Sequence, residues 1–358
     1  MRQTHAARVE RWLGADLAEA VARQAHGWPG PPIPVAGVPG RVYVTGAGEY
    51  IGPIRGGYYA SLADYAVERY RKALRSQLRT AATGFASLSD LITEATTGGK
   101  SQQLHYQKNG LTTAAVGQSQ HLWGVGTFPV AGGNAAGAPG GTVITRTTGG
   151  ALGPQTNPGG TDTLHLTTWT GWASGISAVM LQDYLYGVNN SVNATNTAVT
   201  GVPTRYQSTN AAGNFITGRV TTVLSATATN ITVTYQDQDG NAAEAAAAIA
   251  ARVSAAVNTQ PFTAPAWFVP LNSGDTGARK ITNVQSSGAN TGVVDWMICH
   301  ALAILPCPVA NQPFILDGIN SAFNLVKIET DACLTLMEYV KPATAAMSYG
   351  GLINLVSG

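Results

Sequence analysis

Apolar positions in the C-terminal two-thirds of the chain follow the spacing of β-strands. Ile231, Val233 and Tyr235 alternate with threonines, which predicts a strand with one buried face. Val293–Leu305 is the most apolar segment, so we expect a central strand covered on both faces or a strand buried at a subunit contact. Further strands are predicted near Ile281 and Val284, and at 121–125, 142–146, 163–169, 176–186, 215–224, 267–271, 323–329 and 334–340.

Helical spacing is confined mainly to the first hundred residues. Residues 4–26 predict an amphipathic helix, with Trp12 beside a stripe that includes Leu13 and Leu17. Gly30–Pro34 follows as a stiff linker, so the stripe packs either on its own chain or on a partner. For the partner alternative, the candidate buried contacts are Trp12, Leu13 and Leu17.

A second helix is predicted at 61–80, and cations crowd one side of it. Those cations either form a solvated face or contact an acidic partner surface or nucleic acid. Shorter helices are expected at 87–95 and, in an alanine-rich run, at 242–257. The candidate contact residues on the cationic face are Arg69, Arg71, Lys72, Arg75 and Arg79.

These elements predict a mainly β fold, with sandwich-like or jelly-roll-like strands and an N-terminal α-helical arm. We expect a helical arm and linker at 1–100, a Gly/Thr-rich β region with long loops at 101–200, and a β-sandwich-like domain at 201–358. The loops at 132–141 and 157–160 would be floppy in a monomer, whereas neighbouring subunits could clamp them in an assembly.

Charge is scarce in this chain. Charged residues make up 11% of the sequence, against roughly 25% in an average soluble protein. Much of the surface is therefore either buried against other subunits or built from neutral hydroxyls and amides. The net charge of +2 provides no strong field for nucleic acid or membrane, and we expect neither as a partner. With no apolar leader or membrane-length run, we expect a soluble protein made in the cytoplasm.

Motifs of known chemistry are not found at the required spacings. The six histidines never fall at metal-binding spacing, and the three cysteines are an odd number, with Cys299 and Cys333 expected as inert buried thiols. Asp237–Asn241 resembles half a calcium loop but lacks the distal glutamate, so we expect a tight turn. We therefore predict no catalytic, cofactor-binding or metal-binding residues, and no enzyme activity.

Several stretches resemble a family of virion structural proteins from tailed bacteriophages. The resemblance covers most of the chain from about residue 80, and it implies a non-enzymatic particle component located in the virion. It does not specify the head, the collar or the tail. The stretches that carry it are Gly84–Thr96, Leu122–Gly132, Arg205–Tyr206, Val233–Gly240 and Phe268–Leu271 with Gly274–Arg279.

Within that resemblance we expect a capsid decoration protein, which stabilises the head by bridging neighbouring capsomers as a homo-oligomer such as a trimer. Its partners would be copies of itself and other virion proteins. One alternative is the major capsid protein, although that fold requires long spine helices. The other is a tail or collar protein that binds a receptor or glycan, for which aromatic residues around Tyr58 and Trp169–Trp172 would suit sugar stacking.

Overall fold

The chain divides into two compact units, Met1–Ser87 and Leu88–Gly358. In the first unit, the computed structural model describes three two-residue strands, β1 (Ile33–Pro34), β2 (Tyr43–Val44) and β3 (Tyr50–Ile51), in one antiparallel sheet. Beyond them it describes residues 85, 87–96, 98–110, 119–153, 155–242, 244–263, 268–319, 325–340 and 346–358. The helices predicted at 4–26 and 61–80 lie outside the described residues.

The described residues of the second unit form three antiparallel sheets and one short helix, which confirms the mainly β fold class. The predicted 87–95 helix is present as α4 (Leu88–Thr96), which lies against β20 and β4. The outer sheet has the order β17 (Phe314–Asp317), β8 (Leu164–Ala173), β20 (Ser348–Ser357), β4 (Ser101–Asn109) and β6 (Thr127–Phe128), with β18 (Val326–Ile328) also paired to β8.

The other two sheets complete the unit. The central sheet has the order β11 (Asn214–Thr222), β16 (Val293–Cys307), β9 (Ser177–Ser191), β19 (Leu334–Val340) and β5 (Gln120–His121), with β7 (Thr142–Val143) paired to β9. The distal sheet has the order β10 (Thr197–Ala198), β15 (Ala278–Ser286), β12 (Asn230–Asp237) and β13 (Glu244–Ala245), with β14 (Ile249–Ala250) paired to β12.

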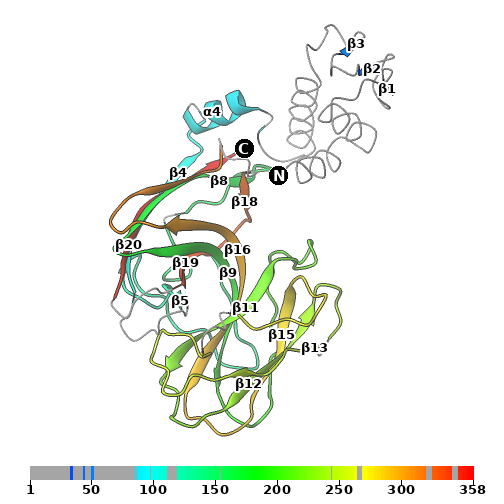
Figure 1. Cartoon of the computed structure of the whole chain (residues 1–358), viewed down its shortest axis with the longest axis vertical. Helices are drawn as coiled ribbons and strands as arrows, with labels where there is room; N and C mark the ends of the chain where they lie inside the picture. The colour runs from blue at the N-terminus through cyan, green and yellow to red at the C-terminus, as the bar shows by residue number, and fades with distance from the viewer. Residues whose placement is uncertain are drawn as a thin grey trace. The chain divides into compact units, whose positions relative to one another are not determined.

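The long strands β9 and β16 contribute to two hydrophobic cores, so two sandwiches share the central sheet (Figure 1). Val179 and Leu305 pack in the core under the outer sheet, whereas Val188 and Trp296 pack in the core against the distal sheet. Register shifts interrupt the β9–β16 ladder between the two halves. A bulge re-aims the side chains that follow it, which lets one strand serve both cores.

The expectation of a fully covered central strand holds for half of β16. Residues 294–299 are buried, whereas Ala301, Ile304 and Pro306 are exposed. The first half lies between β11 and β9, but β11 ends its pairing at His300. Proline is tolerated at position 306 because that half of β16 lies at an edge of the described sheet. No helix among the described residues is long and apolar enough to cross a membrane.

The prediction of a helix at 242–257 is wrong. The described residues of this run form β13 and β14, which pair with β12, followed by turns. Ala246 and Ile249 are buried in the core against the distal sheet, so strand pairing and burial override the helical propensity of alanine. The strand expected at 267–271 is also absent over the described residues 268–271.

Candidate functional site

In the turn at Asp237–Asn241, which resembles half a calcium loop, the Asp237 carboxylate accepts hydrogen bonds from the turn itself. Asp237 Oδ1 accepts hydrogen bonds from the backbone N–H groups of Asp239 and Asn241 at 3.0 and 2.8 Å, and Oδ2 accepts one from Asn241 Nδ2 at 2.8 Å. Burial opposes ionisation of Asp237, but these donors outweigh it and lower the pKa. The described residues contain no cluster of three or more His, Cys, Asp or Glu side chains suited to a metal ion. The arrangement is a self-contained turn.

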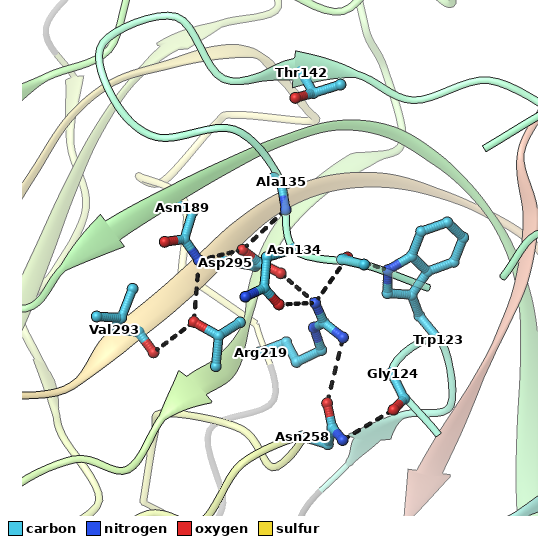
Figure 2. Close-up of polar contacts among 12 residues, drawn as sticks. Trp123, Gly124, Asn134, Ala135, Thr142, Asn189, Arg219, Asn258, Val293 and Asp295 are labelled. Atoms are coloured by element: carbon cyan, nitrogen blue, oxygen red, sulfur yellow. Dashed lines mark hydrogen bonds and ion pairs between the residues drawn. The ribbon is translucent and has the colours of Figure 1, made fainter. Parts of the chain in front are cut away.

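A buried polar row crosses three strands of the central sheet (Figure 2). Asp295 on β16 is the direct cross-strand partner of Arg219 on β11 and of Asn189 on β9. Arg219 Nη2 forms an ion pair with Asp295 Oδ2, and Asn189 Nδ2 donates to Asp295 Oδ1 at 2.6 Å. Both charged side chains are almost fully buried, at 3% and 1% exposure. Buried charges need such partners because desolvation is costly.

This row holds the segment 126–141, which we call the clamped loop. Arg219 Nη2 donates to Gly133 O and to Asn134 Oδ1, both at 3.1 Å, and Ala135 N donates to Asp295 Oδ1 at 3.3 Å (Figure 2). Trp123 Nε1 also donates to Gly133 O, at 3.2 Å. The sequence predicts that the loop at 132–141 would be floppy in a monomer, but Arg219, Asp295 and Trp123 of its own chain hold it.

The start of the clamped loop is held by a second buried cation. Lys108 lies on β4, and its Nζ donates to Val125 O at 2.9 Å and to Pro129 O at 2.7 Å. Burial lowers the pKa of Lys108 to about 8. Between those carbonyls, Thr127 has a φ of 137°, which strains a β-branched residue. The strained backbone at Thr127 is thus held by Lys108 of the same chain. Phe128 next to it remains 49% exposed.

Another buried ion pair ties residues 205–206 to the central sheet. Arg205 binds both oxygens of Asp183 at 2.8 Å, and the ring of Tyr206 stacks on His300 with centroids 3.9 Å apart. Burial raises the pKa of Asp183, and the hydrogen bonds from Arg205 oppose that shift. Next to it, Cys333 N donates to Asp183 Oδ1 at 2.8 Å. The pair therefore fixes backbone position.

The cysteines have the environment of inert thiols. Cys299, Cys307 and Cys333 are all free and buried. Burial raises the pKa of each thiol, which disfavours the reactive thiolate. The expectation of inert buried thiols is confirmed for Cys299 and Cys333.

The tryptophans proposed for sugar stacking lie on a strand, and they point to opposite faces of the outer sheet. Trp169 is fully buried and donates from Nε1 to Tyr106 OH at 2.9 Å, so its ring cannot stack on a ligand. Trp172 lies three positions further along β8 and is partly exposed. Tyr58 is outside the described residues, as are all the predicted contact residues: Trp12, Leu13, Leu17, Arg69, Arg71, Lys72, Arg75 and Arg79.

No family model matches this chain, and no curated protein matches it significantly. Among solved structures, the VP2 subviral particle of infectious bursal disease virus aligns at 13% identity over 57% of this chain and 43% of that chain, with a TM-score of 0.14. The structure of the Gx strain of that virus aligns at 13% identity over 58% and 46%, with a TM-score of 0.13. The chain thus spans less than half of either protein, and similarity this low carries no argument about function.

Proposed function

We propose that this protein is a non-enzymatic structural component of a tailed-phage virion, specifically a decoration protein that bridges capsomers. The observation that carries the proposal is the use of the buried charged groups. Arg219–Asp295, Arg205–Asp183 and Lys108 all bind protein groups, and each fixes a strand or loop in place. A catalytic site needs reactive groups aimed at a substrate. Here the buried charged groups bind the protein's own atoms and hold its strands and loops in place.

The surface of the outer sheet supports the same proposal. Its outward positions on β4 include Gln103, Gln107 and Asn109, all exposed and neutral. The composition left two explanations open, and this face favours a surface built from amides and hydroxyls. Such a surface suits a protein that meets other subunits without strong electrostatic selection. The resemblance of the quoted stretches to tailed-phage virion proteins provides the biological setting.

The major capsid protein is the weaker alternative. In the described part of the chain, α4 is the one α-helix and has 9 residues, so no long spine helix lies there. A decoration protein and a major capsid protein also differ in what happens without them. A shell still assembles when its decoration protein is missing, whereas it cannot form without its major subunit.

Virion composition tests the proposal. Particles that contain this chain would be purified, and its copy number measured against the major shell subunit by quantitative mass spectrometry. We expect a copy number comparable to that of the shell subunit, and intact but less heat-resistant heads when the chain is omitted. A copy number that accounts for only a single small ring of subunits per particle would instead assign the chain to the collar or tail. Loss of all heads would identify it as the shell subunit.

A further inference from the structure

One cross-strand row on the outward face of the outer sheet joins a partly exposed tryptophan to an exposed phenylalanine. Trp172 on β8 pairs with Gly350 on β20, Gly350 pairs with Gln107 on β4, and Gln107 pairs with Phe128 on β6. Directly paired residues point to the same side of a sheet. Inward neighbours such as Tyr349 are buried, so this row faces outward. Three strand spacings separate its ends, roughly 14 Å.

Glycine at position 350 allows Trp172 to lie across the next strand. A Cβ at Gly350 would lie 2.6 Å from Trp172 Nε1 and 2.9 Å from Cε2, closer than any real side chain allows. The indole therefore occupies the space over the backbone of β20. It remains partly exposed, and its N–H makes no hydrogen bond within the described residues. The ring thus lies against the sheet, and its indole N–H is available to donate a hydrogen bond to a ligand.

The polar groups beside the indole are neutral side-chain amides. The side-chain amide of Gln107 is exposed and makes no hydrogen bond among the described residues. Asn109, two positions along β4, accepts one hydrogen bond from Ser348 Oγ at 2.9 Å through Oδ1, and its Nδ2 donates none to the residues that the structure describes. Each amide provides a donor and an acceptor. Trp172, Gln107, Asn109 and Phe128 carry no charge.

The backbone on both sides of Phe128, at the far end of the row, is held by hydrogen bonds. The Lys108 ammonium binds the carbonyls of Val125 and Pro129 on either side of it, and Thr127 Oγ1 donates to Gln107 O. Strained backbone persists only where the surroundings over-determine it, and it concentrates at ligand sites. Preorganised contact groups also lose less entropy on binding. The strain at Thr127 and the burial of Lys108 therefore both support an exposed aromatic contact.

We propose that Trp172, Gln107, Asn109 and Phe128 form a binding site for a neutral oligosaccharide. A sugar ring presents C–H groups to an aromatic face, while its hydroxyls both donate and accept hydrogen bonds, as the amides require. An anionic ligand would find no cation in this row. The separation of the two aromatics requires a chain of several sugars, and this function goes beyond the structural role proposed above.

Binding of neutral hexasaccharides to the full-length protein tests the site. Isomaltohexaose, cellohexaose and chitohexaose would be titrated by calorimetry and ligand-observed NMR, with heparin as the charged comparison. We expect binding of at least one neutral probe and none of heparin. Trp172→Ala should weaken it about tenfold or more. Trp172→Phe should retain part of the affinity, and Gln107→Ala should weaken it less than Trp172→Ala. Val223→Ala removes an exposed side chain elsewhere and should change nothing.

Each other result overturns the proposal. These are no binding of any neutral probe, preference for heparin, or equal binding by wild type and Trp172→Ala. Gly350→Ala provides a second route if Trp172→Ala does not fold, since the added methyl must displace the indole. If Trp172→Ala instead dissociates an oligomer without affecting sugar binding, this face is a contact between copies. None of these outcomes alters the virion copy number, which tests the structural role separately.

Discussion

Replacing Asp295 with alanine should destabilise the second unit and release the clamped loop. The substitution leaves the Arg219 guanidinium buried, at 3% exposure, without its counter-charge. It also removes the acceptor used by Asn189 Nδ2 and Ala135 N. Breaking a buried ion pair by deleting one partner costs about 3–5 kcal/mol. For a unit of this size the Tm should fall by roughly 6–20 °C.

A surface ion pair of the same kind provides the matched control. Lys100 Nζ lies 2.8 Å from Asp162 Oδ2, with side chains 34% and 26% exposed. Because solvent screens that pair, Asp162→Ala should cost at most about 1 kcal/mol. The double variant Asp295→Leu/Arg219→Met should lose less than the sum of its single variants, because it leaves no unpaired buried charge.

Thermal unfolding and limited proteolysis measure the two effects separately. The clamped loop contains no lysine or arginine, so thermolysin, which cuts beside apolar residues, is the appropriate protease. Asp295→Ala should be cut within 126–141 under conditions where wild type and Asp162→Ala are not. The reasoning fails if Asp295→Ala melts within about 2 °C of wild type, or if its loop resists cleavage as well as the wild-type loop does.

Three further predictions concern other parts of the chain. The folded pKa of Lys108, about 8, lies below its unfolded value of 10.5, so the unfolded state binds more protons between those pH values. Wild type should therefore gain stability relative to Lys108→Met from pH 8 to 10, by at most about 1.4 kcal/mol per pH unit. Urea unfolding measures this difference, and a difference that does not change with pH would refute the prediction. EDTA should leave the Tm unchanged because Asp237 binds its own turn, and a drop reversed by calcium would contradict this. Deleting residues 1–35, or changing Leu13 and Leu17 to aspartate, should preserve far-UV β signal while abolishing particle binding; wild-type occupancy would show that the arm is not the anchor.

The sequence alone identified the elements whose pattern is local. β12 alternates apolar residues with threonine, and β16 is a long apolar run, so both follow from patterns of neighbouring residues. β4 and β20 gave no such signal. The outward side of β4 is polar and its inward side includes Lys108, while β20 contains Gly350 and Gly351. Both strands exist because each pairs with its neighbours over most of its length.

Tertiary structure alone decided where the buried charges act. Asp295 lies 76 residues from Arg219 and 106 from Asn189, and no spacing in the chain relates them. Strand register places the three side by side, and burial then makes their pairing obligatory because an unpaired charge could not be desolvated. The same holds for Trp172, Gly350, Gln107 and Phe128, which come from four strands. Periodicity is a property of neighbours along the chain, whereas a site depends on which strands the fold brings together.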